Sequence, residues 1–176
     1  MEGKIFGTDG VRGRFGEGWL TPERVSALGR AVASVCVSSG TGRALIAHDG
    51  RASGPVLERA IAGGLRELGV ESVSAGLLPT PGLAWLTKTG EYDLGVMISA
   101  SHNPAADNGV KIFSASGEKL DDETEALVEE RLWAESEAAG SSIEVPLDES
   151  LREAYTSYLR EHACPDLDLT GMRIVI

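Results

Sequence analysis

Short apolar runs alternate along this chain with longer segments in which apolar residues recur at helical spacing. Two of the longer segments open with a hydroxyl residue and an early proline, at Thr21-Pro22 and at Ser53 to Pro55, which is typical of helix N-termini. Strands that alternate with amphipathic helices favour a layered α/β/α domain with a mixed, largely parallel sheet. The predicted strands are 44–47, 70–75, 94–98 and 110–113, and the predicted helices are 21–36, 53–68, 80–86, 122–132 and 151–162.

The chain of 176 residues has room for one domain of ordinary size and a small appendage, and its 42% hydrophobic content can supply a core. We place the domain at residues 1–150, with a linker at 136–142. Residues 151–176 would add a connecting helix and then an apolar strand, 169–176, which would open a second, truncated domain. Pairing of that strand with the edge of the first sheet is the alternative.

Net charge, the length of the apolar stretches and cysteine spacing argue against several kinds of partner. The net charge of -11 argues against a nucleic-acid partner, because phosphates need a basic face. No apolar stretch has the length of a membrane span or follows the pattern of a signal peptide. Cys36 and Cys164 lie in no metal-binding or redox spacing. We therefore expect a cytoplasmic protein with reduced cysteines and no nucleic-acid or membrane partner.

An unusual polar segment follows the strand predicted at 94–98. There the apolar run stops abruptly in Ser99-Ala100-Ser101-His102-Asn103-Pro104. Ligands of α/β domains bind at the carboxyl ends of parallel strands, so this segment stands where such a fold would place a site. The dipeptide Asn108-Gly109 predicts a tight turn farther along, which would bring Lys111 back beside Ser101.

The residue types around Ser101 allow two interpretations. A serine hydroxyl on a tight loop, next to the imidazole of His102, could be a nucleophile. The G-x-S-x-G pattern of serine hydrolases does not surround this serine, and adjacent side chains rarely point at each other. A turn held by serine and asparagine side chains is the alternative, and the residue types alone favour it.

Two further segments indicate an anionic ligand. "KIFGTDGVRGRFGEG", residues 4–18, combines closely spaced glycines with Arg12 and Arg14. Glycines let the backbone approach an anion, and arginine supplies a forked donor that matches phosphate oxygens. "HDGRASG", residues 48–54, places Arg51 at the start of a helix, without the lysine of a nucleotide-binding loop. For the first segment, a flexible arm is the alternative.

Three motifs together resemble the first domain of the α-D-phosphohexomutase superfamily. They are "FGTDGVRG", "LLPTPGLAWLT", and "SASHNP" followed by "DNGVKIF". The likeness runs from Lys4 to Phe113 in the order and spacing of the family, and it is strongest for the bacterial phosphoglucosamine mutase branch. The serine motif is highly specific and the N-terminal motif moderately so. "LDLTGMRIVI" also resembles the strand that opens the second domain of that family.

The resemblance implies a role for each matching position. Ser101 would carry a phosphoryl group, donate it to one hydroxyl of a sugar phosphate, and recover a phosphoryl group from the other end. Arg12 and Lys111 match positions that neutralise the transferring group or move protons, and His102 matches a residue of the same pocket. A loop-stabilising hydrogen bond is the alternative for His102, and a strand residue facing water is the alternative for Lys111. Asp49 and Arg51 match a position near the site, with structural support as the alternative.

The resemblance also implies a cofactor and absent parts. Mg²⁺ would be held by an oxygen of the phosphorylated Ser101 and by three aspartates of a second domain, beyond Ile176. The sugar-reading and phosphate-binding loops of a third and a fourth domain are absent too. We therefore interpret the chain as the first domain of a longer mutase that interconverts glucosamine 6-phosphate and glucosamine 1-phosphate, close to inactive alone. Whether the parent is a homodimer stays open.

Three other function classes stay open at this point. A phosphoglucomutase or phosphomannomutase would differ in the sugar that it reads. A non-enzymatic anion-binding module would use the glycine and arginine segments to bind sugar phosphates tightly by itself. A serine hydrolase would be labelled at Ser101 by an acylating or phosphonylating probe.

Overall fold

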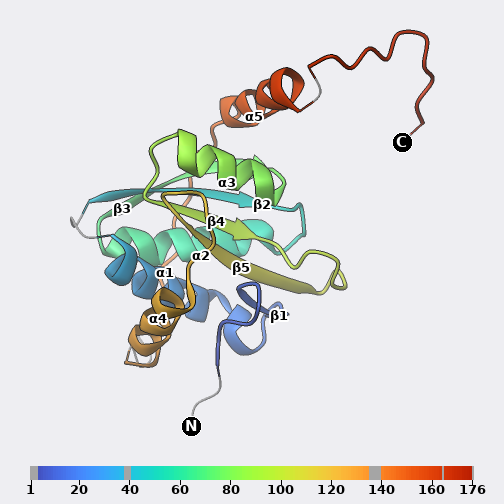
Figure 1. Ribbon diagram of the computed structural model, residues 1–176. Helices are drawn as coiled ribbons and strands as arrows, with labels where there is room; N and C mark the ends of the chain where they lie inside the picture. The colour runs from blue at the N-terminus through green and yellow to red at the C-terminus, as the bar shows by residue number, and fades with distance from the viewer. Residues whose placement is uncertain (1–3, 38–40, 135–139, 164, 176) are drawn as a thin grey trace.

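The computed structural model describes residues 4–37, 41–134, 140–163 and 165–175. The strands are β1 (Val11–Arg14), β2 (Gly42–His48), β3 (Val70–Leu77), β4 (Leu94–Ile98) and β5 (Asp107–Ser114). The helices are the short 3-10 helix η1 (Gly18–Leu20) and the α-helices α1 (Pro22–Cys36), α2 (Gly54–Glu67), α3 (Thr80–Thr89), α4 (Asp122–Ala134) and α5 (Ser150–His162). Figure 1 shows α1, α2 and α4 on one face of the sheet and α3 on the other, which confirms the predicted α/β/α fold.

The strands form one mixed sheet in the order β1-β5-β4-β2-β3. β2 pairs in parallel with both β3 and β4, whereas β5 runs antiparallel to β4 and to β1. Parallel pairing therefore covers the three strands that are connected through helices. β5 follows β4 through a loop without a helix, so it returns antiparallel, as a direct connection requires.

Side chains from the two faces of the sheet form two cores. The larger core lies against α1, α2 and α4, and it contains Leu94, Val96 and Ile98 of β4. The smaller one lies against α3 and contains Met97. β4 is buried on both faces, which explains its unbroken apolar sequence. Burial of each such side chain contributes about 1.5–3 kcal/mol. The end of β4 is thus fixed on both sides, and the polar loop after it starts from a rigid base.

The predicted tight turn at Asn108-Gly109 is wrong, because both residues lie inside β5. Asn108 is fully buried, and its side-chain amide donates a hydrogen bond to the Ser53 hydroxyl over 2.8 Å. A Cβ on Gly109 would stand 2.6 Å from the carbonyl oxygen of Ser99, so the neighbouring strand can approach only a glycine there. Strand pairing has overridden a local turn preference.

The predicted starts of α1 and α2 are confirmed, but Ser53 makes no side-chain cap bond at the start of α2. The Thr21 hydroxyl accepts a hydrogen bond from the backbone N–H of Arg24 at the start of α1. At the start of α4, it is Asp121 that caps the helix, by accepting from the N–H of Thr124 over 2.7 Å. The buried Glu125, in the first turn of α4, pairs with Lys119.

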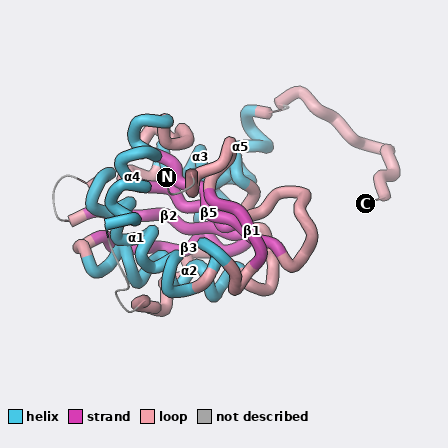
Figure 2. The backbone as a smooth tube through the Cα atoms, turned by 90° about the horizontal axis from the view of Figure 1, so that it is seen from below, coloured by secondary structure: helices cyan, strands magenta, loops and turns pink. Residues whose placement is uncertain are grey.

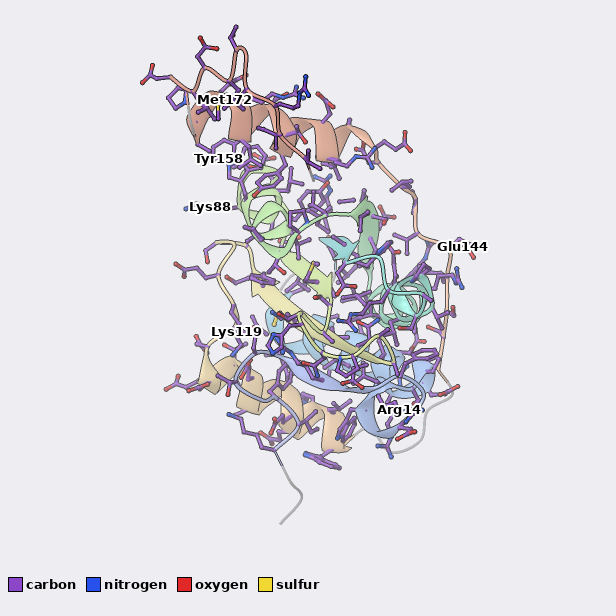
Figure 3. The ribbon with its side chains drawn as sticks, turned by 90° about the vertical axis from the view of Figure 1, so that its right-hand side faces the viewer. Arg14, Lys88, Lys119, Glu144, Tyr158 and Met172 are labelled. Atoms are coloured by element: carbon purple, nitrogen blue, oxygen red, sulfur yellow. The ribbon has the colours of Figure 1, made fainter. Side chains whose placement is uncertain are left out.

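α5 lies on the outer side of α3, and Figure 3 shows it at one end of the stack of layers. Trp85 of α3 stacks on Tyr158 of α5, with ring centroids 4.4 Å apart. Beyond α5, residues 165–175 run away from the body of the molecule, as Figure 2 shows, and they form no strand. A strand needs a neighbouring backbone to pair with, and no described residue pairs with 169–175. The strand predicted at 169–176 is therefore not formed here, and Ile176 lies outside the described residues.

The expectations about cysteines, linker and membrane are tested only in part. Burial, followed by the charge of Asp121, raises the pKa of the Cys36 thiol to about 11, so the thiol stays protonated at neutral pH. Cys164 and residues 136–139 of the predicted linker lie outside the described residues. Every helix in the described ranges is too short or too polar to cross a lipid bilayer.

Candidate functional site

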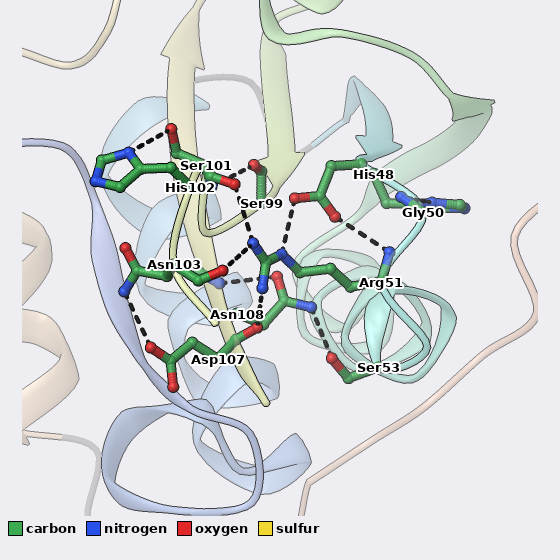
Figure 4. Close-up of polar contacts among 12 residues, drawn as sticks. His48, Gly50, Arg51, Ser53, Ser99, Ser101, His102, Asn103, Asp107 and Asn108 are labelled. Carbon is green, nitrogen blue, oxygen red and sulfur yellow. Dashed lines mark hydrogen bonds and ion pairs between the residues drawn. The ribbon is translucent and has the colours of Figure 1, made fainter. Parts of the chain in front are cut away.

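The residues that join β4 to β5, numbers 99–106, form what we call the serine loop. Ser101 lies at its exposed tip, and its backbone has φ = 57°, in the left-handed region. This conformation costs a residue with a side chain roughly 1–2 kcal/mol. Figure 4 shows the polar contacts that hold the loop in place. A strained, exposed serine at the end of a buried strand is the first feature of the site.

Arg51, from the turn between β2 and α2, reaches across to the serine loop. Its terminal nitrogens donate hydrogen bonds of 2.6 to 3.0 Å to the backbone carbonyl oxygens of Pro104, Asp107, Ser101 and Asn103. The sequence indicated that Arg51 could bind an anion. In the structure its donors are used by carbonyls of the protein, which agrees with the structural alternative.

Asp49 joins Arg51 to the buried Ser99. The Nε of Arg51 donates to a carboxylate oxygen of Asp49 over 3.0 Å, and the Ser99 hydroxyl bonds to the same carboxylate. The Ser99 oxygen in turn accepts from the backbone N–H of Ser101 over 3.0 Å. Burial pushes the pKa of Asp49 up, but the bonds from Ser99 and Arg51 outweigh it, so this pKa lies below its ordinary value.

His102 lies next to the Ser101 side chain. Its Nδ1 is 3.4 Å from the Ser101 hydroxyl oxygen. The two side chains therefore do face each other, which the sequence did not lead us to expect. The distance is longer than the 2.6 to 3.2 Å typical of a nucleophile and its base, and both residues are exposed. The structure thus shows a neighbour of the hydroxyl rather than a formed catalytic pair.

Arg12 on β1 and Lys111 on β5 meet through Asp9. One carboxylate oxygen of Asp9 accepts from both cations, each at 2.5 Å. Gly10 permits this approach, because it has φ = 82° and a Cβ there would lie 2.4 Å from the carbonyl oxygen of Val110. Burial pushes the pKa of Asp9 up, but Lys111 and then Arg12 outweigh that effect, so this pKa is lowered.

Asp9 does not use every donor of this cation pair. Lys111 is only 8% exposed, and it is a point charge held by one carboxylate oxygen. The Nε of Arg12 is buried and has no hydrogen-bond partner among the described residues. Arg12 also lines a hollow of about 340 Å³ with Lys4, Gly7, Thr8 and Asp9. Donors that remain unsatisfied beside a hollow are what an anion site requires.

The serine loop and the cation pair are adjacent without being bonded to each other. Arg12 pairs with Gly109 in the register of β1 and β5, and its side chain lies against this glycine. Ser99, the first residue of the serine loop, contacts Gly109 from the other side. No hydrogen bond joins Arg12 or Lys111 to Ser101 within the described ranges. Arg14 does not join the cation pair of Arg12 and Lys111: its side chain is exposed and pairs with Glu17.

A second hollow, of about 420 Å³, lies directly at Ser101. Its walls are formed by Asp49, Gly50, Arg51, Ser101, Asn103 and Ala105. The residues in described positions contain no group of three or more carboxylate, histidine or cysteine side chains that could hold a metal. Mg²⁺ prefers near-octahedral oxygen ligands. The described part of the chain therefore does not form a complete magnesium site by itself.

Sequence reasoning had overlooked two residues of this site. Asp9 was noted only as an acidic neighbour of the arginines. Ser99 was noted only as the start of a polar run and as a residue that, with the "FGTDGVRG" motif, favours the phosphoglucosamine mutase branch. Their roles depend on the pairing of β1 with β5 and on a hydrogen bond to Asp49, neither of which is written in the local sequence. In the sequence, the signal for Ser99 is a second hydroxyl residue two positions before Ser101.

Comparisons with a family model and with known proteins all match phosphosugar mutases. Residues 3–139 match the family described as phosphoglucomutase/phosphomannomutase, alpha/beta/alpha domain I. The chain is 42% identical over 177 residues to the phosphoglucosamine mutase of Shewanella sp. (strain ANA-3), with 99% of this chain and 40% of that protein covered. It is 44% identical over 182 residues to that of Polaromonas naphthalenivorans (strain CJ2), with 100% and 40% covered. The chain thus spans about 40% of the length of these relatives.

Solved structures show the same fold. A crystal structure of a putative phosphomannomutase from Thermus thermophilus superposes with a TM-score of 0.80 at 31% identity, covering 96% of this chain and 37% of that one. A phosphoglucomutase/phosphomannomutase family protein from Burkholderia thailandensis gives a TM-score of 0.72 at 28% identity, covering 95% and 36%. The arrangement of the sheet and helices is therefore shared with these proteins.

Proposed function

The chain belongs to the phosphoglucomutase/phosphomannomutase family, and we propose that it is the phosphoryl-carrying first domain of a phosphoglucosamine mutase. The observation that carries the proposal is the exposed hydroxyl of Ser101, which stands on a strained and firmly bonded loop beside the Arg12–Lys111 cation pair. The phosphoglucosamine mutases among its relatives support this branch of the family.

In the proposed reaction, Ser101 carries a phosphoryl group on its side-chain oxygen. The bond from phosphorus to that oxygen breaks, and a new bond forms to a free hydroxyl oxygen of glucosamine 6-phosphate or glucosamine 1-phosphate. The sugar hydroxyl loses its proton, and the released Ser101 oxygen takes one up. The bisphosphorylated sugar then returns the phosphoryl group from its other end to Ser101. A covalent carrier of this kind divides one difficult transfer into two easier ones.

Positive charge is what such a transfer needs, because the transferring group is highly anionic and catalysis consists mainly of positioning and neutralisation. We propose that Arg12 and Lys111 supply this charge. They would exchange part of their contact with Asp9 for phosphoryl oxygens. His102, beside the hydroxyl of Ser101, would accept or return the proton of the sugar hydroxyl.

The proposal includes Mg²⁺, which would neutralise charge on the phosphoryl group. From this chain, only an oxygen of the phosphorylated Ser101 would bind it. The other ligands would be aspartates outside the described residues, in a further domain of the parent protein. The relatives are long enough to contain such a domain, since this chain covers only 40% of their length.

The test is the Ser101→Ala variant of the full-length protein. Sugar-phosphate isomerisation measured with glucosamine 6-phosphate should fall to background, while the thermal midpoint stays unchanged, because the hydroxyl is exposed and not part of a core. Ser116→Ala, an exposed serine after β5, is the matched control and should keep full activity. Undiminished turnover in Ser101→Ala would refute the proposal.

The sugar is tested separately. Coupled assays of the full-length protein with glucosamine and glucose phosphates compare kcat/KM for the two sugars. A clear preference for the glucosamine phosphates supports the proposed branch. Equal turnover would favour a phosphoglucomutase or phosphomannomutase, an activity that the names of the structural neighbours also carry.

A further inference from the structure

Arg51 uses every donor that it has on the protein itself. A guanidinium group carries five N–H donors. The Nε donates to Asp49, and the two terminal nitrogens donate to four backbone carbonyls of the chain segment 101–107. The side chain of Arg51 is 12% exposed. Although Arg51 lines the hollow at Ser101, it therefore has no N–H group left for a phosphate in that hollow.

The bonds of Arg51 and Asp49 fix the backbone on both sides of Ser101. The carbonyl of Ser101 accepts from Arg51, and the N–H of Ser101 donates to the Ser99 hydroxyl, which bonds to Asp49. Figure 4 shows the bonds of Arg51 to Asp49 and to the loop carbonyls, and the bond of the Ser101 N–H to Ser99. The contact of Ser99 with Asp49 completes a ring. Of the two peptide groups that determine φ and ψ of Ser101, one is thus held directly by Arg51 and the other through Ser99.

This ring accounts for the left-handed conformation at Ser101. A serine would leave that region readily, because an ordinary backbone conformation is more favourable. Strained residues persist where the surrounding contacts over-determine them, and they gather at functional sites. At Ser101 the strain coincides with the atom that is proposed to carry the phosphoryl group. The direction of the Cα–Cβ bond, and so the position of Oγ, follows from that φ.

We propose that Arg51 is a positioning residue that, together with Asp49, clamps Ser101 in its left-handed conformation and so aims its phosphoryl group at the sugar hydroxyl. This inference rests on the proposed function. Arg51 acts through the carbonyls of the serine loop and not as a ligand of the phosphoryl group. Since transfer requires an in-line approach, a misplacement of about 1 Å lowers the rate by about 100-fold.

The Arg51→Lys variant separates positioning from charge. Lysine keeps the positive charge but cannot reach several carbonyls and Asp49 at once. If the clamp matters, Arg51→Lys in the full-length protein lowers kcat by about 100-fold and leaves KM within about twofold, because sugar binding is unaffected. Arg59→Lys on the neighbouring helix α2 is the matched control, since the Arg59 side chain is 37% exposed and pairs with the exposed Glu144 at 3.7 Å. If charge alone matters, Arg51→Lys keeps the wild-type kcat and the inference is overturned.

A second measurement tests, independently of catalysis, whether Arg51 and Asp49 hold the serine loop in place. Amide hydrogen exchange of the full-length protein should be about tenfold faster in segment 99–107 of Arg51→Lys than in wild type, with the rest of the sheet unchanged. Asp49→Asn, which weakens the same ring at its carboxylate, provides a second variant and should loosen the same segment. Exchange that stays at the wild-type rate in both variants overturns the clamp. A wild-type protein without mutase activity overturns the proposed function instead, and with it the catalytic part of the inference. In that case the exchange rates still show whether Arg51 and Asp49 hold the serine loop.

Discussion

Two carboxylates each hold an arginine beside the serine loop, and they do so in different ways. Asp49 holds Arg51, whose remaining donors are all bonded to backbone carbonyls. Asp9 holds Arg12 and Lys111, and Arg12 retains a buried Nε without a partner among the described residues. The pKa of both carboxyl groups is lowered by their cationic neighbours. The chemistry of the pairs is alike, so what separates the two arginines is the count of satisfied donors: all five in Arg51, and not all in Arg12.

The largest effect that tests this difference is expected from Arg12→Ala. In the full-length protein kcat should fall by about 10³-fold, because a cation that neutralises the phosphoryl group in transit is lost. Hydrogen exchange in the serine loop should stay unchanged, in contrast to Arg51→Lys. Arg14→Ala, on the same strand but exposed, is the control and should keep its activity. If Arg12→Ala instead loosened the serine loop, the two arginines would not differ as described.

A smaller effect is expected from Asp9→Asn. Without the carboxylate, Arg12 and Lys111 have no counter-ion, so the affinity of this chain for inorganic phosphate should rise about fivefold. The same change leaves the buried Lys111 unpaired and should lower the free energy of unfolding by about 1 kcal/mol. Calorimetric titration and denaturant unfolding measure the two quantities.

The control for Asp9→Asn is Glu161→Gln on α5, which changes the net charge equally at an exposed position. It should leave the phosphate affinity as it is. Weaker phosphate binding in Asp9→Asn would mean that Asp9 organises the cations for the ligand, and not that it competes with the ligand for them.

The smallest effect is expected in the pH dependence of stability. The pKa of Asp9 and that of Asp49 are lowered from 3.8 on folding, so both stabilise the fold above that value. This contribution is lost as the pH falls through the lowered pKa values. The free energy of unfolding of wild type should therefore decrease below about pH 4, and the decrease should be smaller in Asp9→Asn and in Asp49→Asn. Equal acid slopes in all three proteins would show that neither carboxyl group has a lowered pKa.

The sequence predicted the elements of the fold well where burial decides them. The apolar run of β4, the capped start of α1 and the early proline of α2 needed no long-range information. The prediction at Asn108-Gly109 was wrong, because the turn preference of this dipeptide is a local property. Its place in β5 depends on contacts with Ser53, which is distant in the sequence, and with Ser99, which follows the neighbouring strand β4. The predicted strand at 169–176 needs a partner strand that the described residues do not provide.

The candidate site was predicted in its parts but not in its arrangement. Ser101, Arg12, Lys111 and His102 could be singled out by residue type and by resemblance. That Asp9 joins Arg12 to Lys111 follows only from the antiparallel pairing of β1 with β5. The role of Arg51 likewise depends on carbonyls about fifty residues away in the chain, and backbone acceptors leave no mark in a sequence.

The central claim, that Ser101 carries phosphate between the two ends of a sugar, is tested most directly by a single-turnover measurement. Full-length protein that carries an isotope-labelled phosphate on Ser101 is mixed with unlabelled glucosamine 6-phosphate, and the label on the peptide that contains Ser101 is followed by mass spectrometry. The account predicts that the label leaves Ser101 at least as fast as the enzyme turns over and appears in the sugar phosphates, because each turnover passes the labelled group to the sugar and takes an unlabelled one back. Label that remains on Ser101 while glucosamine 1-phosphate accumulates would contradict it.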